Sequence, residues 1–266
     1  MARPVRVGVQ LQPQHADYAE IRRAVAEAEE AGVDVVFNWD HFFPLYGEAD
    51  GKHFECWTML GAWAEATSRV EIGALVTSVG YRNPELLADM ARTVDHISDG
   101  RLLLGIGAGW FERDYAEYGY PFGTPGSRLG DLEEALPRIE RRWEALNPAP
   151  TRKIPVLVGG GGEKKTLRYT ARHADIWHGF GDPDTLARKH TVLDEWCVTE
   201  GRDPDEIERS ASAADKGPDE IGEALLRVGT RLVTLGLTGP RYDLGLTRDW
   251  VAWRDDVNRQ QAAAGV

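Results

Sequence analysis

The sequence has few cysteines, few clustered basic residues and no long apolar run. Cys56 and Cys197 are its only cysteines and form no CxxC pair, so neither a disulfide framework nor a cysteine-based metal site is expected. Acidic residues outnumber basic residues 43 to 31, giving a formal net charge of -12. Nucleic acid and anionic membranes are therefore not expected as partners. Because no stretch reaches the roughly 18 apolar residues of a membrane span, and no signal-type segment follows the first residues, we expect a cytoplasmic protein.

Several catalytic patterns are also missing. The sequence has no HExxH motif, no GxSxG elbow and no phosphate-loop motif of the Walker type. His41 has no second histidine at a short ligand spacing, so no metal site is predicted. Covalent hydrolytic chemistry is not expected either.

What the sequence does contain is a regular alternation of strand and helix patterns. Strands are predicted at 5–12, 34–41, 70–78, 101–109, 154–160, 174–180, 206–212 and 231–237, and each is followed by a helical pattern. Eight such units favour a single (β/α)8 barrel domain over residues 1–266 rather than an open doubly wound sheet. The stretch 206–212 has little continuous apolar character, so an irregular seventh strand is the expected weak point.

Polar residues stand near the predicted end of the first strand. In a (β/α)8 barrel the reacting groups lie at the carboxyl ends of the strands. Side chains alternate along a strand, so Val7, Val9 and Leu11 are predicted to face the helices. Gln10 and Gln12 are then predicted to face the barrel interior.

The same reasoning applies to "VVFNWDH", which ends in an acid beside an imidazole. Phe37 and Trp39 are predicted to face the helices, with Asn38 and Asp40 facing inward and His41 at the lip. A carboxylate beside a histidine can fix its tautomer and prepare it for proton transfer near neutral pH. The alternative is a loop capped by Asp40 with a purely structural histidine.

Two glycine runs follow predicted strands. "GIGAGW" (105–110) fails as a dinucleotide fingerprint, because Trp110 stands where the third glycine belongs. It is either a tight turn or a place where a flat ligand or an anion approaches the backbone closely. "VLVGGGGEKKT" (156–166) places four glycines between a buried strand and a helix start, an arrangement typical of a phosphate-binding nest, and a loop without a ligand is the alternative.

Three long stretches together resemble one known family. "EEAGVDVVFNWDHFFPLYG", the segment from "TSRVEIGALVTS" to "GIGAGWFERDYAEYG", and "IPVLVGGGGEKKTLRYTARHADIWHGFGDP" are similar to the bacterial luciferase-like superfamily, and specifically to its branch that uses the deazaflavin coenzyme F420. The resemblance covers roughly residues 5–210. It implies a (β/α)8 barrel with the cofactor across the carboxyl-terminal mouth.

The resemblance also implies roles for the strand ends. His41 would handle the proton that accompanies hydride transfer, with Asp40 contacting the cofactor or holding His41. The third-strand end, "LVTS", matches the place where relatives carry a non-prolyl cis peptide against the ring, which we assign to Val76 and Thr77.

The glycine runs receive roles in the same way. Gly107, Ala108 and Gly109 would pass close to the ring system, with Trp110 as a wall of the pocket. Gly160, Gly161 and Gly162 would receive the cofactor phosphate.

This chain also departs from the family pattern. Sugar-phosphate dehydrogenases of the superfamily have a glutamate where Trp110 stands and a tryptophan shortly after the Asp-His pair, where this chain reads "FFPLYG". Sugar-phosphate oxidation is therefore not expected, and the pocket should be more apolar. The insertion before the fifth strand is also shorter than in relatives. A lid or a dimer contact that relatives build from this insertion would then be reduced or missing.

We therefore predict an F420-dependent oxidoreductase that transfers a hydride between the deazaflavin and a small apolar or conjugated organic substrate. Two alternatives stay open: a flavin mononucleotide (FMN) monooxygenase of the same superfamily and a non-catalytic F420-binding barrel. A homodimer is a possible assembly.

Overall fold

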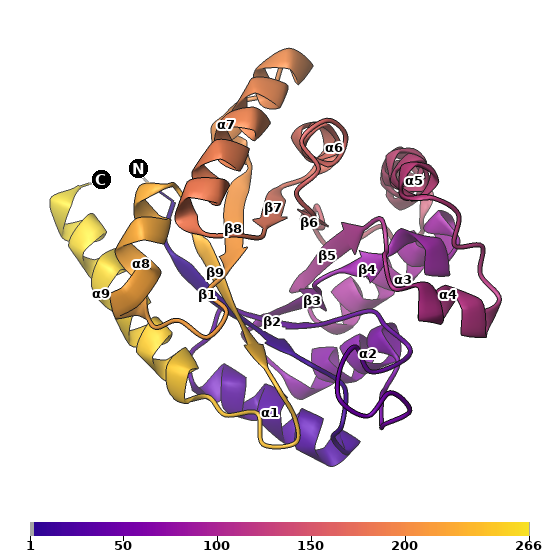
Figure 1. The fold of residues 1–266 in the computed structure, drawn as a ribbon, viewed down its shortest axis with the longest axis horizontal. Coiled ribbons are helices and arrows are strands. Elements are labelled where there is room, and N and C mark those ends of the chain that lie inside the picture. The colour runs from indigo at the N-terminus through magenta and orange to yellow at the C-terminus, as the bar shows by residue number, and fades with distance from the viewer. Residues whose placement is uncertain (1–2, 266) are drawn as a thin grey trace.

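The structure is a computed structural model and describes residues 3–265. In these residues, nine parallel strands form one sheet in the order β3-β2-β1-β9-β8-β7-β6-β5-β4, and β3 also pairs with β5. The extra pairing closes the sheet into the predicted (β/α)8 barrel (Figure 1), in which β3 and β4 share one strand position. The strands are β1 (Arg6–Leu11), β2 (Val35–Asn38), β3 (Glu71–Ala74), β4 (Thr77–Ser78), β5 (Leu102–Gly107), β6 (Val156–Gly159), β7 (Ile176–Gly179), β8 (Glu208–Ser212) and β9 (Leu232–Leu237).

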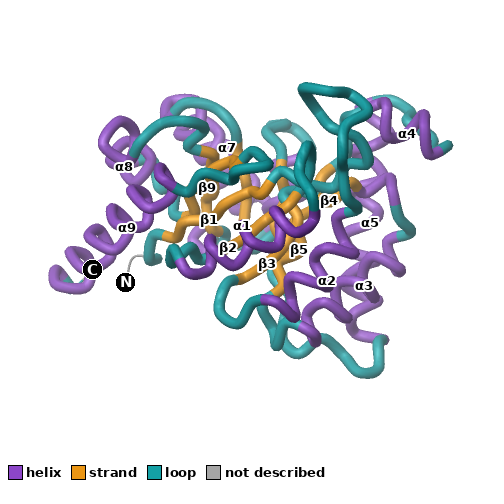
Figure 2. Tube along the Cα trace, turned by 90° about the horizontal axis from the view of Figure 1, so that it is seen from below, coloured by secondary structure: helices purple, strands orange, loops and turns teal. Residues whose placement is uncertain are grey.

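Helices surround the strands on the outside, as Figures 1 and 2 show from two directions. They are α1 (Tyr18–Glu30), α2 (Cys56–Ala66), α3 (Pro84–Ile97), α4 (Glu112–Tyr118), α5 (Pro125–Ala145), α6 (Thr166–His173), α7 (Pro183–Glu200), α8 (Pro218–Arg227) and α9 (Gly245–Ala264). There are also two short 3-10 helices, η1 (Val79–Tyr81) before α3 and η2 (Pro204–Glu206) before β8. No helix within residues 3–265 has the length and apolar character needed to cross a membrane.

The local differences from the sequence prediction are few. The predicted strand 70–78 is interrupted after Ala74, and α4 was not predicted. The predicted weak strand is regular, because β8 pairs with both β7 and β9. The connection between α5 and β6 spans residues 146–155, so it is as short as predicted.

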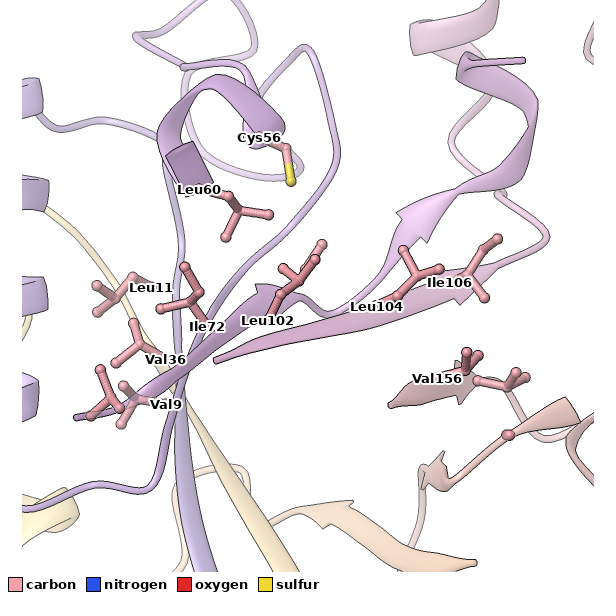
Figure 3. Packing of buried hydrophobic residues seen from close by; sticks show 14 of the residues in the cluster. Val9, Leu11, Val36, Cys56, Leu60, Ile72, Leu102, Leu104, Ile106 and Val156 are labelled. Carbon is pink, nitrogen blue, oxygen red and sulfur yellow. The ribbon is translucent and has the colours of Figure 1, made fainter. Parts of the chain in front are cut away.

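The core has an outer and an inner layer. Figure 3 shows the outer layer, in which Val9, Leu11 and Val36 of the strands pack with Leu60 and Cys56 of α2. Burying each large apolar side chain contributes about 1.5–3 kcal/mol, so this layer carries much of the stability. The inner layer fills the barrel interior with Val35, Phe37, Leu103, Leu157, Ile176 and Leu232.

Charged side chains close the amino-terminal end of the barrel. Arg6 lies between Glu71 and Glu208, each at the first position of its strand. Arg152 also contacts Glu71, at 3.2 Å. Burial alone would lower the pKa of Arg6, but the two carboxylates outweigh it and raise the pKa above its usual value. The guanidinium therefore stays charged and paired.

Candidate active site

A cavity of about 450 Å³ lies at the opposite, carboxyl-terminal end of the barrel. The ends of β1, β2, β5, β6 and β7 contribute to it, as expected for the active face of this fold. Its charged lining is limited to the Asp40 carboxylate, and it contains no Lys or Arg among the described residues. The lining residues are Gln10, Trp39, Asp40, His41, Leu45, Leu75, Val76, Ser78, Gly107, Ala108, Gly109, Trp110, Gly159, Gly160, Thr166, His178 and Phe180.

Most of the predicted site residues meet in this cavity. They come from four strand ends and are Asp40, His41, Val76, Gly107, Ala108, Gly109, Trp110 and Gly160. Three others do not line it. Thr77 is buried and accepts a hydrogen bond from Trp57 Nε1 of α2 (3.2 Å), so it points toward the helix layer. Gly161 and Gly162 lie farther along the glycine loop.

The predicted orientation of β1 is confirmed, and Asp40 after β2 lines the cavity as predicted, but the orientations of Phe37, Asn38 and Trp39 are wrong. Phe37 packs inside the barrel and Trp39 lines the cavity, so both face inward. Asn38 instead faces α2, where its side chain donates to the Cys56 carbonyl and accepts from the Cys56 thiol (both 3.0 Å). A buried amide needs such partners, and α2 supplies them.

His41 is held by a carboxylate that the sequence reasoning missed. His41 Nδ1 lies 2.7 Å from Asp114 Oδ2, and Asp114 is fully buried on α4. Asp114 also accepts hydrogen bonds from Tyr81 Oη (2.8 Å) and from the Phe42 N–H (3.1 Å). Because a carboxylate only accepts, this set of donors places the proton of neutral His41 on Nδ1. Nε2 is then the basic nitrogen, with no partner among the described residues.

Asp40 does not hold His41, contrary to one of the predicted roles. Its carboxylate accepts from both terminal nitrogens of Arg82 (2.6 and 2.9 Å) and from the Ser78 N–H (3.0 Å). Burial raises the pKa of Asp40, and Arg82 opposes that shift. Arg82 also donates to Glu55 at 2.7 Å, and Glu55 caps α2. Asp40 therefore fixes the backbone beside Val76 and connects it to α2.

Val76 lines the cavity and packs against glycines of β5 and β6. The peptide bond between Leu75 and Val76 is cis, one bond earlier than the position we predicted. A Cβ added at Gly107 or Gly159 would lie 2.8 or 2.9 Å from the Val76 side chain. Glycine on β5 and on β6 is therefore what makes room for this valine.

The glycine loop after β6 is fixed through its carbonyl groups. Trp177 Nε1 donates to the Gly160 carbonyl (2.8 Å), Lys189 donates to the Gly161 carbonyl, and Trp196 Nε1 donates to the Glu163 carbonyl (2.7 Å). Within the described residues, the backbone N–H groups of 161–166 have no acceptor. Because these donors are unused and lie before α6, the loop can bind an anion.

Aromatic side chains form part of the cavity wall, and the predicted Trp110 is one of them. Trp110 and Phe180 line the mouth, and each is 62% exposed. Phe42 stacks on Tyr118 with ring centroids 4.0 Å apart, away from the lining. Trp57 and Trp177 are buried, and they donate to the Thr77 hydroxyl and to the Gly160 carbonyl, respectively. Alternation along β2 could have identified Trp39 had its inward face been assigned correctly.

No group of three or more His, Cys, Asp or Glu side chains within residues 3–265 has an arrangement that could hold a metal ion. The two cysteines are buried and separate. Two oriented imidazoles, those of His41 and His178, line the cavity together with uncharged hydrogen-bonding groups.

Comparison with known proteins agrees with this arrangement. The luciferase-like monooxygenase family matches residues 1–214. The chain belongs to this family. A phthiodiolone/phenolphthiodiolone dimycocerosates ketoreductase of Mycobacterium tuberculosis is 31% identical over 217 residues, which is 71% of this chain and 55% of the ketoreductase. The chain spans about half the length of the curated relatives it matches.

Solved structures show the same fold. An F420-dependent secondary alcohol dehydrogenase, in complex with an F420-acetone adduct, superimposes with a TM-score of 0.82 at 18% identity, covering 92% of this chain and 96% of the dehydrogenase. A riboflavin lyase with modified FMN superimposes with a TM-score of 0.69 at 16% identity, covering 85% of this chain and 66% of the lyase. At these identities the likeness concerns the fold.

Proposed function

We propose that this protein is an F420-dependent oxidoreductase that interconverts a small secondary alcohol and its ketone, or a related conjugated substrate. The observation that carries the proposal is the pair of His41 and Asp114. It puts a basic imidazole nitrogen, oriented by a buried carboxylate, into a cavity that an anion-binding glycine loop borders. The alcohol dehydrogenase and the ketoreductase described above support the choice of substrate class.

The residues present fit a deazaflavin. The cavity volume falls within the roughly 300–1,000 Å³ of small-molecule and cofactor sites. Val76, seated on Gly107 and Gly159, offers an apolar surface for one face of a ring. The free N–H groups of 161–166 suit the phosphate on the ring's side chain. We assign the phosphate to this loop, including Gly161 and Gly162 outside the cavity lining.

The proton and the hydride have separate acceptors in this proposal. When bound, the deazaflavin accepts a hydride from an alcohol or donates one to a ketone. His41 takes the hydroxyl proton on Nε2 during oxidation and returns it to the carbonyl oxygen during reduction. Asp114 keeps the Nδ1 proton in place, so that the imidazolium that forms faces a carboxylate. Leu45, Trp110 and Phe180 supply apolar walls to the cavity.

An FMN monooxygenase is the second candidate. The name of the family and the riboflavin lyase fold favour it, and the glycine loop suits either phosphate. Binding separates the candidates, since F420 and FMN differ in the ring that must lie on Val76. Titration of the protein with each cofactor, followed by ring fluorescence, should give the tighter dissociation constant for F420. Tighter binding of FMN would reverse the order of the two candidates.

Turnover separates an enzyme from a cofactor-binding barrel. With F420 bound, secondary alcohols should bleach the ring absorbance, and His41→Ala should slow this reaction by about 10²–10⁴-fold. His173→Ala is the matched control, because His173 Nδ1 also lies against a carboxylate, Glu140 (2.9 Å), but outside the cavity. Equal rates for the wild-type protein and His41→Ala would remove the catalytic role.

A further inference from the structure

A second cavity of about 380 Å³ lies beside the first at the same end of the barrel. The two share four wall residues, Gln10, Leu75, His178 and Phe180. The remaining walls come from the ends of β1, β8 and β9 and the turn after β8. They are Gln12, Ser212, Ala214, Asp215, Thr234, Leu235 and Gly236. Because these residues border both cavities, one ligand could extend from beside His41, past the shared residues, into the second cavity.

The second cavity contrasts with the glycine loop in its charge. Asp215 is its one charged side chain, and no Lys or Arg lines it among the described residues. Asp215 also forms no ion pair with a described residue, and Lys216, the next residue, does not line the cavity. A phosphate or carboxylate placed here would meet a negative charge without a compensating cation. Binding of a phosphate or carboxylate group in the second cavity is thus disfavoured.

Uncharged hydrogen-bonding groups make up the rest of its polar surface. Gln12 accepts a hydrogen bond from Thr238 through Oε1 (2.9 Å), and its Nε2 has no acceptor among the described residues. Ser212 and Thr234 add hydroxyl groups. Such groups recognise hydroxyls, carbonyls and amides.

His178 lies at the wall between the two cavities. Its Nδ1 is 2.9 Å from Ser210 Oγ on β8, and its Nε2 has no partner among the described residues. Complete burial lowers its pKa to about 4, so the ring is neutral at physiological pH. The backbone holds it as well, because the His178 carbonyl accepts from the Gly160 N–H (3.2 Å). His178 is thus a fixed, uncharged group with one ring nitrogen available to a ligand.

We propose that the second cavity binds an uncharged hydroxyl, carbonyl or amide group of the substrate, with His178 Nε2 as its hydrogen-bond partner and Asp215 excluding anionic groups. The inference rests on the proposed function, because the first cavity must hold the ring for the substrate to reach both His41 and the second cavity. It names the substrate class as a polar but not acidic alcohol or ketone.

The test uses the F420-loaded protein and secondary alcohols of matched chain length that end in a hydroxyl, an ammonium or a carboxylate. The wild-type protein should oxidise the hydroxyl-ended alcohol with a kcat/KM at least about tenfold above that of the carboxylate-ended one. Asp215→Lys should remove or reverse this preference, with the F420 dissociation constant unchanged, because Asp215 lies outside the first cavity. A preference that Asp215→Lys leaves intact would overturn the assignment.

Two substitutions at His178 separate hydrogen bonding from packing. His178→Asn keeps an amide near Nδ1 for Ser210 but has nothing at the Nε2 position, so it should raise KM for the hydroxyl-ended alcohol about fivefold with little change in kcat. His178→Gln reaches the Nε2 position and should restore most of that loss. Equal losses in both variants would contradict the proposed bond.

The outcomes also distinguish this inference from the proposed function. If F420 binds and all three alcohols are oxidised at equal kcat/KM, the second-cavity assignment fails and the proposed function stands. If F420 binds but no alcohol bleaches the ring and none shifts its spectrum, the proposed function fails and the second-cavity assignment fails with it.

Discussion

At the amino-terminal end of the barrel Arg6 lies between Glu71 and Glu208, whereas at the carboxyl-terminal end His41 and His178 each keep one ring nitrogen without a partner among residues 3–265. The same strands supply both ends. At the first, charged groups satisfy one another. At the second, each polar group is fixed by one partner and has a bonding position left over, which a ligand can use. Hydrogen-bonding groups that are oriented but unused therefore mark the functional end of the barrel.

Replacing the carboxylate behind His41 should have the largest effect. Asp114→Asn offers an amide N–H to His41 Nδ1, so the ring proton moves to Nε2 and the basic nitrogen no longer faces the substrate. We expect kcat for alcohol oxidation to fall about 10³-fold, with a smaller change in KM. Glu140→Gln, at the other His-carboxylate pair, is the control and should leave kcat unchanged. A similar kcat for Asp114→Asn and the wild-type protein would contradict the positioning role.

Breaking the ion pairs at the amino-terminal end of the barrel should lower the stability of the protein rather than its activity. Arg6→Met leaves Glu208 buried, with no other cation against it among the described residues. We expect the free energy of unfolding to fall by about 3 kcal/mol, measured by urea denaturation. Lys153→Met removes an exposed ion pair with Asp175 and should cost at most about 1 kcal/mol. Equal losses would mean that burial does not distinguish the two pairs.

Low pH should reduce the free energy of unfolding through buried histidines at the functional end of the barrel. Burial lowers the pKa of His178 and of His53 to about 4, below the usual 6.5, and His41 adds to the shift of His53. Between these values the unfolded chain binds more protons than the folded one, so stability falls as the pH drops from about 6.5 toward 4. Each histidine should cost about 2 kcal/mol on going from pH 7 to pH 5. His178→Phe should make the pH dependence of the unfolding free energy shallower, and an unchanged slope would refute this account.

The smallest effect is expected at the glycine loop. Trp196→Phe removes the hydrogen bond to the Glu163 carbonyl, which frees the loop to turn its N–H groups away from an anion. We expect the F420 dissociation constant to rise about fivefold, with kcat nearly unchanged. Trp143→Phe loses an equivalent bond, to the Ala88 carbonyl (2.9 Å) far from the loop, and should bind F420 like the wild-type protein. Equal F420 dissociation constants for the two variants would contradict this role of Trp196.

Hydrophobic alternation predicted where the strands and most helices lie, but it misjudged one orientation. Val35, Val36 and Phe37 are all apolar, so the pattern of β2 does not reveal which face is inside. Asn38 carries a buried amide that faces the helix layer. Because the sequence does not show its partner on α2, the pattern predicts that this polar side chain faces inward. Buried strands in parallel sheets often carry this ambiguity, because both faces are covered.

The site was predictable where its residues stand at the ends of strands and unpredictable where they stand on a helix. Asp40, His41 and the glycine runs stand at strand ends, and the barrel rule makes strand ends converge. Asp114 is 73 residues from His41, on a helix that no pattern indicated, so nothing in the sequence connects the two. The sequence offers the neighbouring Asp40 either for that role or as a contact of the cofactor, and in the structure Arg82 pairs with its carboxylate.

The order and spacing of the apolar segments specify the closed barrel, because they allow few other ways to bury those segments. The sequence also determined that an imidazole and a glycine loop would share one end. Which acid holds His41, which side chains enter the barrel and where a second cavity opens were decided by the tertiary structure. Those features depend on contacts between segments far apart in the chain, and such contacts are set by how side chains pack once the strands have closed.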